Sequence, residues 1–548
     1  MSTVARKIML NTVSQVFAKV LIGLFSVIIL KMLTGYLGKY GYGFYKSIYE
    51  FLALFAIVAD MGLYTIGVRE MSKSPEREEM VLGNMMSART VVIVLISLVA
   101  IAASFAIGEF QGTIAPWAIA IASLASLFAI LTGTVSTVLQ VHLQMEKNSW
   151  GSIIGKLVAL AYMSVVIFWW FPHSCEGGDV LKFLGGDGGA CSVSEGAFEQ
   201  LIIAGLVGNI VMYFVTAYYA SKLVKIKYRV DWWFWKEVLL KALPYGFALI
   251  LNQVIFRIGS IFLLNMKGPE FVATYSAPST MLEAAGIVPL YFMNAILPFL
   301  TKTLHAKDGS HKGIIQISFD MLMMASLPIV AGTYILAYQM IYLVATPEFL
   351  SNIGVGYWGS DVVLQILIFA LLFSFLNGLF GYVLVASEHQ EKLLIRNFFG
   401  AILTAFLTWW WVPIWDVRGA AYANVITEFY IFVASYYLAK KYVDFQIKLG
   451  TLFKIFISTV VMSAVLYLVK DPIYNFAHLQ NKSFLVLIPL SMVVYFIMLR
   501  LTGALTKEMM AMVMKRKMVP AGETVGGVST DVASEASGAE VHDSENLK

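Results

Sequence analysis

The chain has few charged residues, and this shortage indicates which class of protein it belongs to. Of its 548 residues, 13% are charged and 59% are hydrophobic, whereas a soluble domain carries roughly 25% charged residues. Apolar runs recur from Ile8 to Leu501, each long enough to cross a hydrocarbon core of about 30 Å as a helix. The sequence therefore predicts an all-α polytopic membrane protein and excludes a soluble fold.

The chain also lacks the motifs of several function classes. It has neither a G-x-x-x-x-G-K-[ST] loop for nucleotide hydrolysis nor an H-E-x-x-H metal motif. We expect no enzyme activity, no cofactor, no metal and no nucleic-acid partner. A membrane-embedded sugar polymerase or glycosyltransferase stays a weaker alternative, because such enzymes need a catalytic external loop and the predicted loops are mostly short.

Cysteine is nearly absent, since Cys175 and Cys191 are the only two. Both fall in the polar segment 172–198, which is predicted to be an external loop. A disulfide between them would contribute roughly 3 kcal/mol in an oxidising compartment. The alternative is two free thiols, whereas a metal site has little support because only His173 is nearby.

The apolar runs number about fourteen. They fall at about 8–34, 43–66, 84–107, 116–140, 151–171, 199–221, 238–264, 271–300, 314–343, 362–386, 397–413, 418–439, 452–470 and 483–501. Most lysines and arginines, Lys156 among them, are assigned to the loops of one side. The other side holds only Lys39, Lys182, Lys267, Arg418, Lys470 and Lys482. By the positive-inside rule, both termini are expected in the cytoplasm, with the chain in the cytoplasmic membrane.

Two copies of one pattern follow each other along the chain. The first two spans align without a gap on the seventh and eighth, with Phe17 on Phe247 and Gly38 on Gly268. Later, "GTVSTVLQVHLQMEK" (133–147) aligns with "GLFGYVLVASEHQEK" (378–392), and Gly155 with Gly400. Six spans are an even number, so the repeats are parallel, as in transporters whose substrate site lies between two halves.

The repeat divides the chain. We expect an N-lobe at 1–230, a C-lobe at 231–442, two further helices at 443–502 and a cytoplasmic tail at 503–548. Beyond Lys517 the composition changes to Gly, Ser, Glu and Asp, which predicts disorder from about 518.

Charged residues within the spans are candidate site residues, because each costs about 2.5 kcal/mol or more in lipid. Lys19 is predicted near the middle of the first span, where its stem is too short to reach the interface. Asn11 and Gln15 precede it at steps of four, so the three form one polar stripe. An ammonium there suits a phosphate, although Lys19 could instead neutralise a buried carboxylate.

The other embedded charges have two interpretations each. Glu283 and Glu428 are predicted near the midplane, as coupling groups, as partners of Lys19 or as protonated carboxyls. Arg257 and Gln253 share a polar face that could line a cavity. Lys46 and Glu50 are four residues apart, so mutual neutralisation is as plausible as ligand binding. We expect Arg89 to reach the membrane interface from near a helix end.

The opening "N-x-x-x-Q", "LGKYGYGFY" (37–45), "DMGLYTIGVRE" (60–70) and "QMEK" after a helix together resemble the oligosaccharide and polysaccharide flippases (Wzx-like) of the MOP superfamily. That superfamily also holds lipid II flippases and MATE exporters. The resemblance implies two six-helix lobes around a cavity, with alternating access that carries a lipid-linked sugar to the outer leaflet.

The resemblance also implies cations that hold the substrate's pyrophosphate. Our candidates are Lys19, Gln15, Asn11, Arg257 and Gln253, with Glu283, Glu428 and Glu50 as coupling or counter-ion groups. The expected partners are the bilayer, the lipid-linked sugar and glycan-assembly enzymes. A MATE-type, cation-coupled exporter of small molecules that depends on Glu283 and Glu428 is the alternative.

Overall fold

The structure is a computed structural model. It describes residues 3–60, 62–72, 75–172, 194–306, 309–389, 391–475 and 483–505. Cys175, Cys191 and the tail predicted to be disordered from about 518 lie outside the described residues.

The first half of the chain forms one helical lobe. Apolar runs form its long helices, and mostly polar or glycine-containing segments join them. Its helices are α1 (Thr3–Asp60), α2 (Leu63–Met71), α3 (Glu78–Ser104), α4 (Ala115–Val141), α5 (Met145–Val165) with a π-helical end at Val166–Trp170, and α7 (Glu195–Ser221). Short 3₁₀ turns lie at Pro75–Arg77 and Gly108–Phe110.

The second half forms a matching lobe and two added helices. Its helices are α8 (Trp232–Lys267), α9 (Pro269–Ala285), α10 (Ile287–Ala306), α11 (His311–Val344), α12 (Ser360–Ala386), α13 (Glu391–Tyr442), α14 (Gly450–Asn475) and α15 (Phe484–Leu501). Two 3₁₀ turns, Pro347–Phe349 and Ile353–Val355, interrupt the connection between α11 and α12. The described residues form no β-strand.

Two of the helices are too long for one crossing. α1 has 58 residues and α13 has 52, and at 1.5 Å per residue each would reach about 80 Å or more. Each is broken by a residue with non-helical dihedral angles, Gly38 in α1 and Asp416 in α13. Each therefore supplies two spans.

The described part of the chain holds 11 helices that are long and apolar enough to cross a membrane. α1 and α13 each count twice, and α9 with α10 forms one more span, which Gly286 interrupts. The total agrees with the prediction of fourteen, and the all-α membrane fold is confirmed.

The two halves repeat each other down to the backbone of their turns. Gly38 has φ 65° and ψ −175°, and its sequence counterpart Gly268 has φ 93° and ψ 179°. Such positive φ angles are open to glycine at little cost. At the opposite end of the bundle, the aligned residues Leu143 and Glu388 have φ 53° and 62°.

The same turn is closed by the same hydrogen bond in both halves. The amide of Gln144 donates to the carbonyl of Leu139 at 2.7 Å, and the amide of His389 donates to the carbonyl of Leu384 at 2.9 Å. The parallel repeat predicted from the sequence is therefore present in the backbone.

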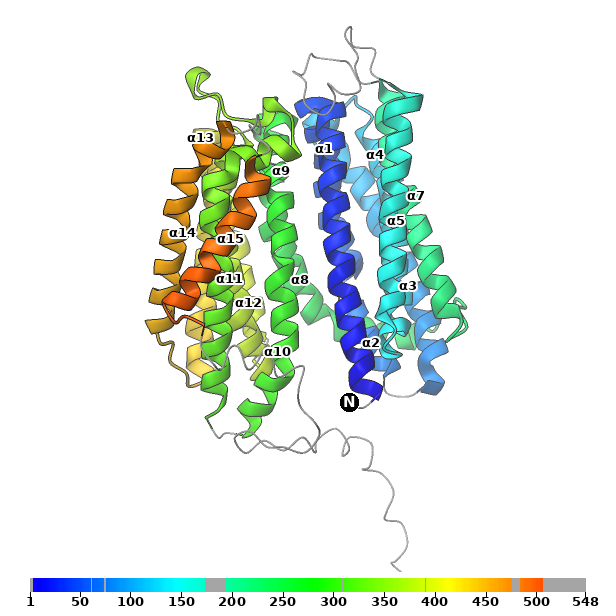
Figure 1. The fold of residues 1–548 in the computed structure, drawn as a ribbon. Coiled ribbons are helices and arrows are strands. Elements are labelled where there is room, and N and C mark those ends of the chain that lie inside the picture. Colours follow the sequence, from blue (N-terminus) through cyan, green and yellow to red (C-terminus); the bar gives the residue numbers. More distant parts are fainter. Residues whose placement is uncertain are drawn as a thin grey trace, which may run out of the picture.

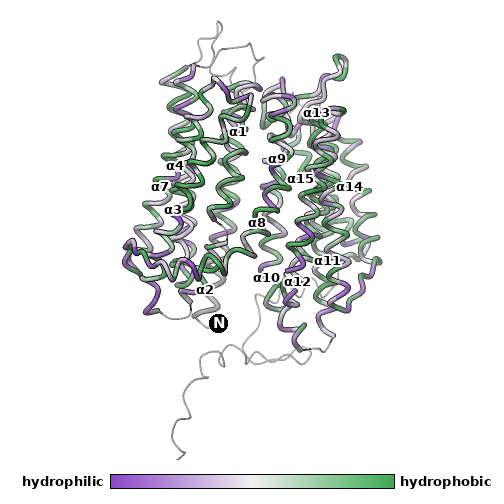
Figure 2. The backbone as a smooth tube through the Cα atoms, turned by 180° about the vertical axis from the view of Figure 1, so that it is seen from behind, coloured by the Kyte–Doolittle hydropathy of each residue, from purple (hydrophilic) through white to green (hydrophobic). Residues whose placement is uncertain are grey.

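The lobes stand side by side, with α1 of the first lobe against α8 and α9 of the second (Figure 1). α14 and α15 pack on α11 at the outer side of the second lobe, where the Tyr495 hydroxyl donates to the carbonyl of Met324 at 2.8 Å. Hydrophobic residues dominate the middle of the helices, and hydrophilic ones gather toward their ends (Figure 2). We call the end that carries Gly38 and Gly268 the turn end, and the other the N-terminal end.

Candidate functional site

Four charged side chains from both lobes meet between α1, α8 and α9. Arg257 Nη1 lies 2.6 Å from Glu50 Oε2 and 3.1 Å from Glu283 Oε1. Lys46 Nζ lies 3.3 Å from the other Glu50 oxygen. We call Lys46, Glu50, Arg257 and Glu283 the central cluster. It brings together three residues selected from the sequence, and Lys46 and Glu50 form an ion pair, which is one of the two interpretations that their spacing left open.

The fold places this cluster near mid-membrane. Glu50 follows Gly38 by twelve residues and Arg257 precedes Gly268 by eleven, so both lie about 17 Å from the turn end at 1.5 Å per residue. Glu283 sits in the last turn of α9, just before the interruption at Gly286. Glu50 is buried, with 6% of its side chain exposed, whereas Glu283 keeps 45% exposed. The Glu283 side chain is thus the most exposed of the four.

Lys156 joins this group from α5. It lies eleven residues inside α5 and is half-buried. It is close enough to Lys46 for the two charges to act on each other. No carboxylate among the described residues pairs with it. Assigning Lys156 to a loop was wrong, because it lies inside both the predicted span 151–171 and the helix α5.

The five charges do not cancel. Lys46, Arg257 and Lys156 carry three positive charges and Glu50 and Glu283 two negative ones, which leaves one cation in excess. In a medium of low dielectric constant, an uncompensated ammonium group favours an anionic ligand strongly. A phosphate or diphosphate group matches this excess, and it would compete with Glu283 for Arg257.

Lys19 lies apart from the central cluster. It precedes Gly38 by nineteen residues, so it is about 28 Å from the turn end. It is exposed, on the side of α1 away from the exposed apolar stripe of Phe17, Leu24 and Ile28. It pairs with no described carboxylate. Gln15 is half-buried one turn earlier, and Asn11 belongs to the same helix.

The remaining predicted residues lie in the second lobe. Gln253 is half-buried one turn before Arg257. Glu428 is buried in α13, where its carboxylate accepts a hydrogen bond of 2.5 Å from the Asn377 amide. Arg396 is near enough to interact electrostatically with Glu428 and donates to Ser435 Oγ at 2.7 Å. The structure therefore separates Glu428 from Glu283 and from Lys19.

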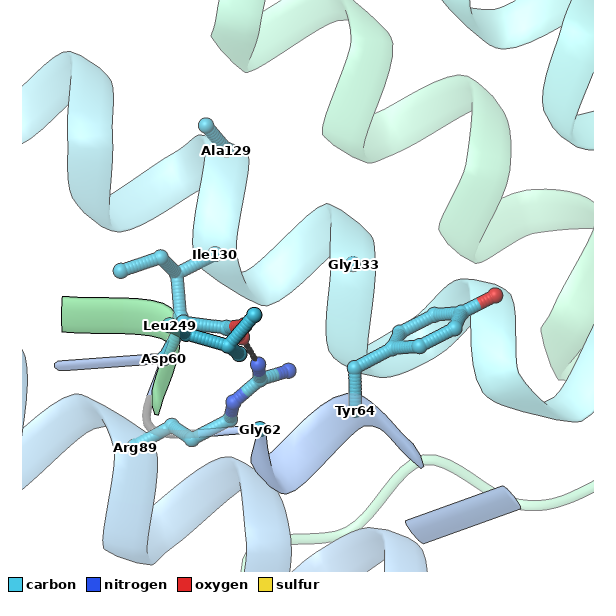
Figure 3. A pocket seen from close by; sticks show the side chains of 8 residues that line it. All are labelled: Asp60, Gly62, Tyr64, Arg89, Ala129, Ile130, Gly133 and Leu249. Atoms are coloured by element: carbon cyan, nitrogen blue, oxygen red, sulfur yellow. Dashed lines mark ion pairs between the residues drawn. The ribbon is translucent and has the colours of Figure 1, made fainter. Parts of the chain in front are cut away.

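A second charged site lies nearer the N-terminal end of the first lobe. Arg89 is 1% exposed and forms an ion pair with Asp60, and its Nη1 donates to Thr134 Oγ1 at 2.8 Å. The interfacial location expected for Arg89 was wrong, because α3 begins at Glu78 and Arg89 lies deep within it. The pair borders a cavity of about 430 Å³, which Leu249 of the second lobe also lines (Figure 3).

The lobes are closely joined at the turn end. Lys39 lies 3.7 Å from Glu270 and 4.1 Å from the ring centre of Tyr357, both in the second lobe. Lys31 Nζ donates to the carbonyls of Ala345 at 2.8 Å and Tyr342 at 3.3 Å. This end is closed in the structure.

The sequence contained a sign that Lys156 is embedded, but none that Arg89 pairs with Asp60. Lys156 sits in the run "GSIIGKLVALAYMSVV", whose apolar residues continue on both sides, so its place inside the predicted span 151–171 was already a sign that it is embedded. Arg89 and Asp60 are far apart along the chain, and no local spacing shows that they pair.

The family model described as "Polysaccharide biosynthesis protein" matches residues 4–304. The chain belongs to this family. The matched segment includes the four residues of the central cluster, which come from both lobes, and Lys156 of the first lobe.

A known relative is also a polysaccharide biosynthesis protein. The capsular polysaccharide biosynthesis protein CapF of Staphylococcus aureus is 26% identical over 235 residues, which are 41% of this chain and 56% of CapF. The matched segment thus spans little more than half of that relative's length.

Solved structures share the fold of this family member. The lipid II flippase MurJ in an inward closed conformation superposes with a TM-score of 0.66 at 12% identity, over 93% of this chain and 99% of MurJ. An inward-facing MATE transporter of the MOP superfamily gives 0.56 at 14% identity, over 80% and 97%. The chain therefore shares the fold of the MurJ and MATE structures.

Proposed function

We propose that the protein moves a lipid-linked oligosaccharide from the inner to the outer leaflet of the cytoplasmic membrane by alternating access. The turn end faces outward and both termini face the cytoplasm, as the distribution of lysine and arginine supports. The lobes rock about the central cluster, and substrate release requires the Lys39 and Lys31 contacts to break. Glycan-assembly enzymes on both sides of the membrane would supply and consume the substrate.

The single observation that carries this proposal is the excess positive charge near mid-membrane. Lys156 has no described carboxylate partner, and Arg257 is held by Glu283, which is itself accessible. The substrate diphosphate binds Lys156 and displaces Glu283 from Arg257, so that its charge replaces that of the carboxylate. Lys19 and Gln15 lie on the path toward the cluster from the N-terminal end, where they attract the same diphosphate.

The test uses the purified protein in vesicles and follows translocation of lipid-linked oligosaccharide from its own host. We expect Lys156→Ala to lower the rate at least tenfold and Lys156→Arg to retain much of it, because the positive charge is kept. Lys19→Ala should lower the rate less. Full activity of Lys156→Ala at normal expression would refute the phosphate assignment.

A second candidate function is cation-coupled export of small molecules, as in MATE transporters. The observation that favours it is the accessible Glu283 carboxylate, together with the buried Glu428. It predicts efflux of an organic cation such as ethidium that collapses with the ion gradient and is lost in Glu283→Gln. Ethidium retention in vesicles with an intact gradient would exclude it.

A further inference from the structure

The cavity beside Arg89 and Asp60 has the features of a ligand site of its own. It is formed by the end of α1, the start of α2, α3, α4 and, from the other lobe, Leu249 of α8 (Figure 3). Its volume of about 430 Å³ lies within the range of small-molecule pockets. Most of its lining is apolar, with a few polar groups on one side, which is also typical of such pockets.

The positive and negative charges that border this cavity cancel. Arg89 and Asp60 pair directly, so the site carries no net charge, unlike the central cluster. A phosphate would meet the Asp60 carboxylate, and an organic cation would meet the Arg89 guanidinium. An uncharged ligand with many hydroxyl groups suits both, because each hydroxyl can donate to a carboxylate and accept from a guanidinium.

The Asp60 carboxylate is the charged group that a ligand in this cavity can reach, because Arg89 is almost wholly buried beside it. Two nitrogens of Arg89 are engaged by Asp60 and Thr134, but Nε has no partner among the described residues although the side chain is 1% exposed. Buried donors are normally satisfied. Asp60 remains 31% exposed, so its carboxylate is reachable from the cavity.

Glycine keeps the approach to the guanidinium open. A Cβ atom added at Gly133 would meet nothing nearer than Arg89 Nη1, at 3.9 Å. Gly133 therefore faces the cavity directly. The Tyr64 ring lines the same side, and its hydroxyl points away from the pair and donates to Gln140 (Figure 3).

We propose that this cavity binds a sugar unit of the lipid-linked glycan, with Asp60 bonding its hydroxyls, Arg89 holding the Asp60 carboxylate in place, and Leu249, Ile130 and Tyr64 packing on its apolar face. The proposal rests on the proposed function. Asp60 follows Glu50 by ten residues of the same helix, or about 15 Å. One substrate can therefore hold its diphosphate at the central cluster and its glycan at the cavity.

The test compares two probes for binding to the full chain in nanodiscs. One is the lipid-linked oligosaccharide isolated from the protein's own host, and the other is polyprenyl diphosphate without sugar. Gly133→Ala and Gly133→Leu fill the cavity in two steps. Gly332→Leu is the matched control, because a Cβ at Gly332 meets nothing within 4 Å and this residue of α11 does not line the cavity.

We expect Gly133→Leu to weaken binding of the oligosaccharide probe at least tenfold and that of polyprenyl diphosphate less than twofold, with Gly133→Ala between it and the wild type. Asp60→Asn should reduce the preference for the sugar-bearing probe, and Gly332→Leu should change neither affinity. Equal weakening of both probes, or no preference for sugar in the wild type, overturns the sugar site.

Lys156→Ala should weaken binding of both probes. If it weakens binding of neither probe while Gly133→Leu acts selectively, the phosphate assignment fails alone.

Discussion

The two repeats share their turns but not their charges. Gly38 and Gly268 make the same turn, whereas each member of the central cluster aligns with an uncharged residue of the other repeat. The pairs are Lys46 with Ser276, Glu50 with Thr280, Arg257 with Val27 and Glu283 with Ala53, and Lys156 corresponds to Ala401. The backbone turns are thus common to both copies, whereas the charges of the candidate site occur in only one copy. Substitutions at equivalent positions of the two repeats can therefore separate the effects of the shared backbone from those of the added charges.

The largest effect is expected at Glu50. Glu50→Ala leaves Lys46 and Arg257 near an empty space in a low-dielectric region, which costs about 3–5 kcal/mol for a buried pair. We expect little folded protein in detergent, measured by thermal unfolding. Thr280→Ala at the equivalent position removes an uncharged hydroxyl that donates to the Ser276 carbonyl and also hydrogen-bonds with Tyr42, and it should cost about 1 kcal/mol. Similar losses for the two variants would contradict the comparison.

Gly43 and Ala273 are also equivalent, and they differ by one methyl group. A Cβ at Gly43 would lie 1.8 Å from the carbonyl oxygen of Pro269, so Gly43→Ala must push the lobes apart at the turn end. We expect a loss of about 1–3 kcal/mol in unfolding free energy. The reverse change, Ala273→Gly, relieves no contact and should cost about 1 kcal/mol from helix propensity. A neutral Gly43→Ala would show that the lobes are not in contact there.

Lys39 tests the closure of the turn end. Lys39→Met removes the ion pair with Glu270 and the contact with Tyr357, together worth about 1 kcal/mol at a partly exposed site. We expect about threefold to tenfold faster maleimide labelling of Thr274→Cys, which is buried in the closed state, with Cys175 and Cys191 replaced. Lys267→Met removes a pair with Asp416 inside one lobe and should leave the labelling rate unchanged.

The smallest effect concerns the matched turns at the N-terminal end. Leu143 and Glu388 both adopt a positive φ, which costs a residue with a side chain roughly 1 kcal/mol. Leu143→Gly and Glu388→Gly should therefore each stabilise the protein by up to about 1 kcal/mol, measured by thermal unfolding. Destabilisation by either one would mean that its side chain contributes more than the turn costs.

Sequence reasoning reached the fold because lipid imposes its constraint locally. Every span must be apolar along its length, and the turn residues Gly38 and Gly268 stand at aligned positions, so spans and repeat are visible in one dimension. The central cluster was partly predictable for the same reason, since Glu50, Arg257 and Glu283 are out of place in apolar runs. Their mutual contacts were not, because these depend on how α1 packs against α8 and α9. Arg89 was misplaced because its depth was counted from a span end that was uncertain by several residues, whereas Lys156 was counted with the loops although the predicted span 151–171 encloses it.

Lys31 has a consequence for the membrane as a whole. Its ammonium group caps the last carbonyls of α11 across the lobe interface, where a helix end carries partial negative charge. Separating the lobes would leave both the cation and these carbonyls without their partners, so the empty protein is held shut at this end. We therefore expect vesicles that contain it to maintain a proton gradient as well as protein-free vesicles do, and to leak only while substrate passes.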